Sequence, residues 1–172
     1  MELLQFREEG FVSHASRLPD AEYGRVLDDI VVTCVDCVVA YGEQMLLGLR
    51  RQEPYKGGWW VPGGRMHPGE RFEETAQRVL RRELGLKVIA DRFDYISTTS
   101  YIWSRREQPP ADHGCHMIGV NLVLRISLKE SQQITHGEDY QTSRWANLRE
   151  VFTNNHYHPV IRRFAGFLLQ GP

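Results

Sequence analysis

The sequence predicts an α+β sandwich, in which helices cover the faces of a β-sheet. Two observations carry this prediction. Segments with the composition of strands recur through most of the chain, whereas helical periodicity is confined to a few segments. Strands mixed with few helices favour this layered arrangement. With 172 residues, the chain is long enough for one domain with a sizeable core.

Local signals place the elements in order along the chain. Residues 1–18 are predicted to form an N-terminal extension, and Pro19-Asp20 opens a short helix. Gly42-Glu43 joins two strands into a hairpin. Apolar and polar residues alternate only weakly along 115–128, which predicts a strand covered on both faces. Strands are predicted at 31–41, 44–50, 59–61, 87–93, 95–104, 115–128 and 143–146, and helices at 19–28, 70–84 and 158–169.

Composition argues against several kinds of partner and location. The 21 Lys and Arg residues balance 22 Asp and Glu residues, which leaves no basic field for nucleic acid. No apolar run approaches the ~20 residues of a membrane span. The N-terminus, MELLQFREEG, has acids where a secretion signal has basic residues. Three cysteines make a poor disulfide framework, so we expect a cytoplasmic protein.

The segment 60–86, WVPGGRMHPGERFEETAQRVLRRELGL, carries the strongest functional signal. A strand ends in a Pro-Gly-Gly turn, a loop follows, and a helix runs from Glu70 to a stop at Gly85. Gly63 and Gly64 let the backbone turn sharply and approach a ligand, and a carbonyl released there can bind a hard cation. Such a strand–loop–helix gathers backbone groups, arginines and carboxylates around one small volume, which suits a metal–diphosphate.

Two further residues of this segment are expected to support the site. The role of Glu70 is left open by the sequence, and Arg78 is expected to position other side chains. The charge of Glu70 opposes the positive end of the helix dipole, and its carboxylate could instead contact a metal. Arg78 follows Glu74 by four residues, so it shares a helix face with that acid and is expected to orient loop carboxylates.

The segment resembles the Nudix hydrolase box, written G-x5-E-x7-R-E-U-x-E-E-x-G-U with U an aliphatic residue. The resemblance implies an α/β/α sandwich around a mixed β-sheet, a single Nudix hydrolase domain over 19–172 and a box over 64–86. The residues that match the spacing are Gly64, Glu70, Arg78, Glu83 and Gly85.

Three positions near the end of the box helix depart from the family. A typical Nudix pyrophosphatase has glutamate at all three, whereas this chain has Val79, Arg82 and Glu83. Two negative charges are lost and one positive charge is gained, a change of three charge units. Close divalent ions repel unless carboxylates offset them, so we expect one hard ion, Mg²⁺ or in its place Mn²⁺, with Glu83 as ligand.

The reduced box resembles that of GDP-mannose mannosyl hydrolases, a Nudix subfamily that hydrolyses GDP-mannose to GDP and mannose with inversion at C1. LLGLRRQEPYKGGWWVPGGR is similar to that family's LLGKR…GYWFVPGGR, and RVLRRELGL is similar to its RLTMAELGL. With one ion, stabilising a leaving diphosphate is easier than attack on phosphorus. We therefore expect Mg²⁺-dependent hydrolysis of a nucleotide sugar, GDP-mannose first, by water attack at the anomeric carbon. The resemblance also implies a homodimer.

The resemblance assigns the remaining roles residue by residue. Glu83 and the Gly63 carbonyl would hold the metal, and Glu138 or Asp139 could add a carboxylate. His136, in a loop, is the candidate catalytic base.

Four further residues complete the predicted site. Arg50 and Arg65 match arginines that bind phosphate and offset leaving-group charge, and Asp36 matches an aspartate on the first long strand of the subfamily. Trp59 and Trp60 alternate across a strand, so one is expected in the core and the other against a base or at a dimer contact, and Trp60 is taken as substrate-binding.

Two rival functions stay open at this point. A Nudix pyrophosphatase would cut between the phosphates of a nucleoside diphosphate derivative. A catalytically inactive nucleotide-sensing domain is compatible with the two missing glutamates, whereas retention of Glu83, Arg78 and the Gly-Gly turn argues for turnover.

Overall fold

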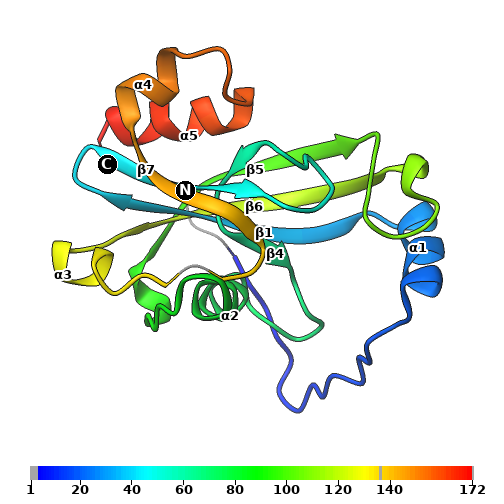
Figure 1. Cartoon of the computed structure of the whole chain (residues 1–172). Coiled ribbons are helices and arrows are strands. Elements are labelled where there is room, and N and C mark those ends of the chain that lie inside the picture. Colours follow the sequence, from blue (N-terminus) through cyan, green and yellow to red (C-terminus); the bar gives the residue numbers. More distant parts are fainter. Residues whose placement is uncertain (1–3, 136, 172) are drawn as a thin grey trace.

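A computed structural model describes residues 4–135 and 137–171, and it confirms the predicted α+β class. Within these residues, a seven-stranded sheet lies between helices on its two faces (Figure 1). Helix α2 covers one face, and α4 and α5 cover the other. The bounds of these helices are α2 Phe72–Leu84, α4 Leu148–Thr153 and α5 Pro159–Leu169.

The first long strand, β1 (Val32–Tyr41), organises the sheet. It pairs in parallel with β6 (Cys115–Arg125) along one edge. Its other edge pairs antiparallel with β4 (Gly63–Arg65) near the start and with β2 (Gln44–Arg50) at the hairpin. The sheet is therefore mixed, as the family resemblance implied. The remaining strands are β3 (Trp59–Trp60) and β7 (Tyr140–Asn147), which pair with β2, and β5 (Phe93–Trp103), which pairs with β6.

Alternate side chains of β1 enter two separate cores. Val38 and Ala40 pack with residues of α4 and α5, whereas Cys37 and Val39 pack with Leu80 and Leu84 of α2. Both faces of the strand are thus covered, which explains its nearly unbroken apolar sequence.

Helix α2 is held at both ends by specific groups. It begins at Phe72 rather than at the predicted Glu70, because the Glu74 carboxylate accepts the backbone N–H of Arg71 at 2.6 Å and caps the first turn there. The predicted stop is confirmed, since Gly85 adopts a left-handed conformation with φ 68°.

The N-terminal extension lies against the start of this helix. The Gln5 side chain accepts the backbone N–H of Phe72 at 2.8 Å, and Arg7 donates to the Gly69 carbonyl at 2.9 Å. The described part of the extension has no helix or strand before α1 (Asp20–Asp29). In Figure 1 its dark-blue trace leaves the region of α2, loops out below the sheet and returns to α1.

The predicted strand over 87–93 is wrong. That stretch crosses from α2 to the edge of the sheet and contains a 3₁₀ turn, Ala90–Arg92, before β5 begins. Arg92 holds this crossing in place by donating to the Arg125 carbonyl at 2.8 Å and pairing with Glu130. The predicted strand over 115–128 ends at Arg125, because Ser127 caps a short helix, α3 (Leu128–Ser131).

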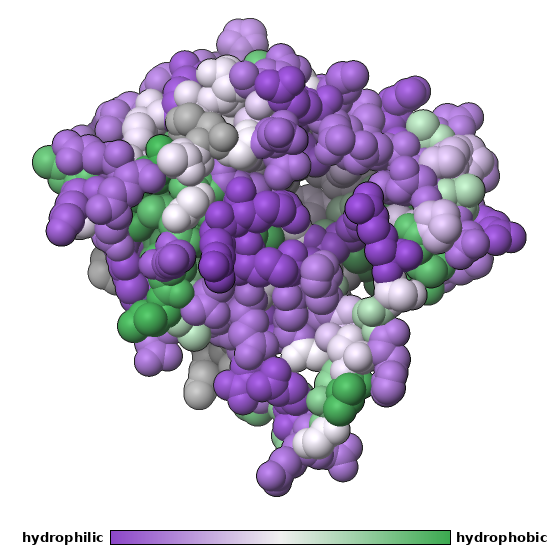
Figure 2. All heavy atoms as spheres, turned by 60° about the horizontal axis from the view of Figure 1, so that its bottom comes forward, coloured by the Kyte–Doolittle hydropathy of each residue, from purple (hydrophilic) through white to green (hydrophobic). Residues whose placement is uncertain are grey.

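A helix that spans a bilayer needs about 20 predominantly apolar residues. None of the helices in the described ranges is both long and apolar enough to cross a bilayer. The face shown in Figure 2 is mostly hydrophilic, with hydrophobic residues in small separate groups.

We predict that Leu80→Ala lowers the free energy of unfolding by about 2–5 kcal/mol, the usual range for emptying a packed leucine site. Leu80 is fully buried between α2 and the sheet. The matched control is Leu128→Ala in α3, where the side chain is 53% exposed. Urea unfolding of both variants measures the difference, and equal midpoints would contradict the assignment of the α2 core.

Candidate active site

A cleft of about 400 Å³ lies at the end of the sheet beside β4 and α1. Its walls come from α1, β1, the end of β2, the box segment, and the loops before β3 and after β5. Seven residues singled out from the sequence line it together: Asp36, Arg50, Trp60, Gly63, Gly64, Arg65 and Glu83. The predicted site residues thus converge on one volume.

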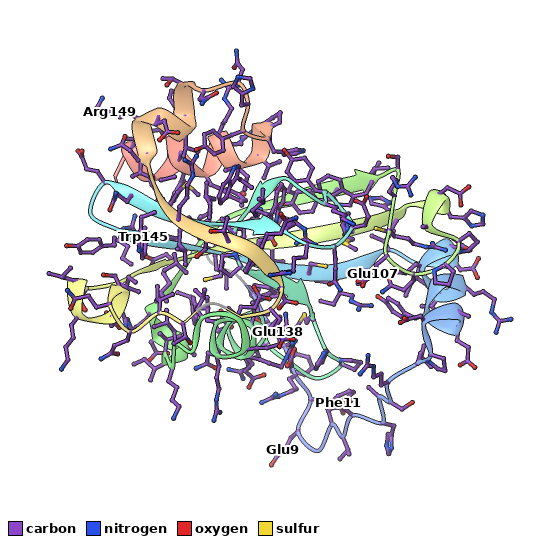
Figure 3. The ribbon with its side chains drawn as sticks, in the orientation of Figure 1. Glu9, Phe11, Glu107, Glu138, Trp145 and Arg149 are labelled. Atoms are coloured by element: carbon purple, nitrogen blue, oxygen red, sulfur yellow. The ribbon has the colours of Figure 1, made fainter. Side chains whose placement is uncertain are left out.

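One predicted site residue does not line the cleft, and another lies outside the described residues. Glu138 is exposed and does not line it, whereas its neighbour Asp139 does. In Figure 3, Glu138 lies beside α2 and Glu107 lies on the loop beside α1. His136 lies outside the described residues, so its role as base stays a prediction.

Asp36 forms the buried acidic floor of the cleft. Only 6% of the residue is exposed. Trp60 Nε1 donates to one carboxylate oxygen at 3.4 Å, and the Tyr101 hydroxyl donates to the other at 3.0 Å. Burial raises the pKa of Asp36 to about 6, although these two donors oppose the shift.

Glycine is required at position 63 because the backbone passes close to Asp36, and not because the chain turns sharply there. It pairs in register with Asp36 across β1 and β4, and a Cβ at this position would lie 2.2 Å from Asp36 Oδ1. The chain bends at Pro62, whereas Gly63 and Gly64 lie in β4 without positive φ angles, so the predicted turn at the two glycines is misplaced. A Cβ on Gly64 would lie 3.0 Å from Val79 of α2, which shows how closely the strand passes the helix.

Glu70 and Arg78 brace the loop between β4 and α2. Arg78 donates to both Glu70 oxygens, at 2.5 and 2.7 Å, and to the Arg65 carbonyl at 2.9 Å. Glu70 also accepts the Thr75 hydroxyl and the backbone N–H of His67. Partial burial raises the pKa of Glu70, but the hydrogen bonds from Arg78, His67 and Thr75, together with the Arg78 charge, outweigh it and lower the pKa to about 2. These contacts support a bracing role for Glu70 in place of metal contact.

Glu83 is the most buried carboxylate of the cleft wall, with 2% of the residue exposed. Arg82 donates to its Oε1 at 2.5 Å, and the Tyr140 hydroxyl donates to its Oε2 at 2.7 Å. Burial raises the pKa of Glu83, and its two donors only partly offset this. Tyr140 was missed by sequence reasoning, because only the pairing of β7 with β2 brings it beside the box helix.

Two arginines face the cleft from the ends of strands. Arg50 at the end of β2 is half-buried, and its Nε donates to the Pro54 carbonyl at 2.8 Å. Arg65 at the end of β4 is exposed, and its guanidinium lies 4.0 Å from the centre of the Tyr23 ring. These two cations give the cleft the means to bind a doubly charged anion.

Trp60 belongs to the aromatic core more than to an open binding face. It is 5% exposed, and its ring packs edge-on against Tyr55, Tyr101, Trp103 and His158. Its contribution to the cleft is the indole N–H that holds Asp36.

The cleft presents oxygen donors that fit a hard cation. Among the described residues, no group of three or more His, Cys, Asp or Glu side chains is arranged to hold a metal. Glu83, Asp139 and the Gly63 backbone border the same volume. Mg²⁺ in proteins is commonly held by one or two carboxylates together with substrate phosphates and water, so this sparse set of oxygen donors fits it.

A mixed sheet between helices, with a strand–loop–helix that brings arginines and carboxylates to one cleft, defines a domain of the Nudix type. The family model described as the NUDIX domain matches residues 32–164, and the chain belongs to this family.

Curated relatives match parts of the chain. A low-salt glycan biosynthesis protein of Haloferax volcanii is 36% identical over 73 residues, which are 42% of this chain and 47% of that protein. Nucleoside triphosphatase NudI of Escherichia coli is 35% identical over 103 residues, which are 56% of this chain and 67% of that protein. The chain thus spans about half the length of the first of these relatives.

Solved structures share the fold. A MutT protein from Methanosarcina mazei superposes with a TM-score of 0.63 at 15% identity, over 81% of this chain and 94% of that chain. The NUDIX domain of NrtR from Shewanella oneidensis, complexed with ADP ribose, gives a TM-score of 0.60 at 17% identity, over 89% and 98% of the two chains. At these identities the likeness is one of fold.

We predict that Asp36→Asn changes how stability depends on pH. Because folding raises the pKa of Asp36 from about 4 to about 6, the folded protein binds this proton more tightly. The associated stability is fully present below pH 4 and is lost as pH rises through 6.

Relative to the variant, the wild-type free energy of unfolding should therefore fall by up to about 3 kcal/mol between pH 4 and pH 7. Urea unfolding of both proteins across this range measures it. A difference that does not vary with pH would show that Asp36 ionises normally in the folded state.

Proposed function

We propose that this protein is a Mg²⁺-dependent hydrolase of nucleoside diphosphate sugars, with GDP-mannose as the preferred substrate. The observation that carries the proposal is the balance of charge in the cleft. Among the described residues, five acidic residues line the cleft beside Arg50, Arg65 and Arg82. However, Glu83 and Asp139 contact Arg82, and Asp36 is buried beneath Trp60 and Tyr101. No described group of three or more His, Cys, Asp or Glu side chains is arranged to hold metal ions. This balance supports capture of a leaving diphosphate over activation of water at phosphorus.

The proposed reaction breaks the bond between the anomeric carbon and the diphosphate oxygen. The oxygen of a water molecule attacks that carbon, the bonding electrons leave with the diphosphate, and a base takes the proton of water. His136 is proposed as that base. Arg50 and Arg65 bind the diphosphate and offset the charge that it gains on leaving. Asp36, fixed by Trp60 and Tyr101, is placed to orient the sugar or the attacking water.

Glu83 and the Gly63 carbonyl are proposed to hold the metal. Of the two further carboxylates suggested by the sequence, Glu138 and Asp139, we propose Asp139, because it lines the cleft. When bound, a divalent ion would supply additional positive charge to the diphosphate. Residues 19–172 are proposed as the catalytic domain, with 1–18 as an extension that braces the start of α2. A homodimer and a cytoplasmic location also belong to the proposal.

A second candidate is a pyrophosphatase that acts at phosphorus. Two comparisons favour it: the relative from Escherichia coli is named a nucleoside triphosphatase, and the NrtR domain was crystallised with ADP ribose. The first name implies cleavage at phosphorus, and ADP ribose is a nucleoside diphosphate derivative.

Hydrolysis of GDP-mannose in ¹⁸O-labelled water distinguishes these functions. We expect GDP without label and mannose carrying one labelled oxygen, because water attacks carbon. Mass spectrometry of both products provides the measurement. Label in a nucleoside monophosphate would establish the pyrophosphatase, and absence of any product across a panel of nucleotide sugars with Mg²⁺ or Mn²⁺ would favour a sensing domain.

We predict that Glu83→Gln reduces metal-dependent turnover by at least about 100-fold, because a neutral amide is a poor ligand for a hard cation. The measurement is the initial rate across a Mg²⁺ titration. Glu43→Gln, in the exposed hairpin turn, is the matched control and should keep wild-type rates. Equal metal dependence in the two variants would remove Glu83 from the metal site.

A further inference from the structure

Arg82 occupies a position that the box spacing gives to a glutamate, and its side chain reaches the cleft. Its Nη2 lies 2.5 Å from Glu83 Oε1, and its Nε lies 3.5 Å from Asp139 Oδ2. A Cβ on Gly64 would lie 3.8 Å from the same Nη2. The guanidinium thus lies between the two carboxylates and close to the strand that carries the box glycines.

The two carboxylates are held in place around this guanidinium. Glu83 is anchored by Tyr140 and is almost fully buried. The loop that carries Asp139 is tied to the end of α2, since the Gly137 backbone N–H donates to the Glu83 carbonyl at 2.8 Å. A Cβ on Gly137 would lie 3.1 Å from the Glu83 Cα, so this contact is close. Arg82 is therefore positioned by a buried carboxylate on its own helix and by a more exposed carboxylate on the loop before β7.

The guanidinium remains available to a ligand. The Arg82 side chain is 54% exposed although it contacts both carboxylates. A guanidinium has five N–H donors in a planar fork, which is more than two carboxylate contacts require. The same geometry suits phosphate oxygens, and it places a permanent cation where the charged end of a substrate would enter.

We propose that Arg82 is a third diphosphate ligand, and that by pairing with Glu83 and Asp139 it also weakens metal binding at those carboxylates. This inference rests on the proposed function for the identity of the substrate, but not for the phosphate contact itself. It has two consequences of opposite sign. Removing the guanidinium weakens the binding of diphosphate without metal, and it frees two carboxylates to bind a divalent ion more tightly.

The test uses inorganic pyrophosphate and Mn²⁺ as separate probes on the full chain. Arg82→Gln should weaken pyrophosphate binding about tenfold in EDTA, measured by calorimetry, because one charge-assisted contact is lost. The same variant should bind Mn²⁺ more tightly, measured by electron paramagnetic resonance without substrate. Arg81→Gln is the matched control, since Arg81 is an exposed neighbour that does not line the cleft.

Arg82→Lys keeps the positive charge and is the second variant in the test, to be used if Arg82→Gln is unstable. It should bind pyrophosphate with intermediate affinity and Mn²⁺ close to the wild-type level. The proposal is overturned if both Arg82 variants match Arg81→Gln for both probes. If instead the wild type releases no product from nucleotide sugars while pyrophosphate binding still depends on Arg82, the proposed function fails and this inference stands.

Discussion

The site depends on one constraint, which is the close pairing of Gly63 in β4 with Asp36 in β1. Only a residue without Cβ fits between β1 and β4 at this register, since a Cβ would lie 2.2 Å from the carboxylate. This pairing fixes where the box segment leaves the sheet. The Arg78 contacts with Glu70 and the Arg65 carbonyl then fix how the loop enters α2. Asp36, Arg65 and Glu83 are thereby directed into one cleft.

The charge of this cleft sets the chemistry that it can support. Glu83 and Asp36 are both buried, and burial raises the pKa of each, so neither offers a freely solvated carboxylate. Arg82 further offsets Glu83 by direct contact. These contacts support the proposal that the site receives negative charge in preference to concentrating cations. Departure of a diphosphate from carbon requires a site that receives negative charge. Metal-assisted attack at phosphorus commonly requires a site that concentrates cations.

The sequence predicted the hairpin of β1 and β2, the helix that ends at Gly85 and the packing of β6 between two layers, because each has a local signal in turn residues or periodicity. It failed for 87–93, where apolar composition suggested a strand but the chain bridges from α2 to β5. It also failed for the Gly-Gly segment. Glycine suggested a turn there, whereas the structure uses the missing side chains for the close approach of two strands.

What the sequence determined by itself was the set of residues that belong to the box, because their spacing along one strand, one loop and one helix is preserved in the linear chain. Only the tertiary structure decided which residues from elsewhere join them. Tyr140 and Tyr101 reach the cleft through pairing with β2 and β6, and no local pattern encodes such long-range contacts. The structure likewise selects Asp139 over Glu138, a choice that the sequence left open. The physical reason is that the hydrogen bonds and burial that define these roles arise only when distant strands are brought into register.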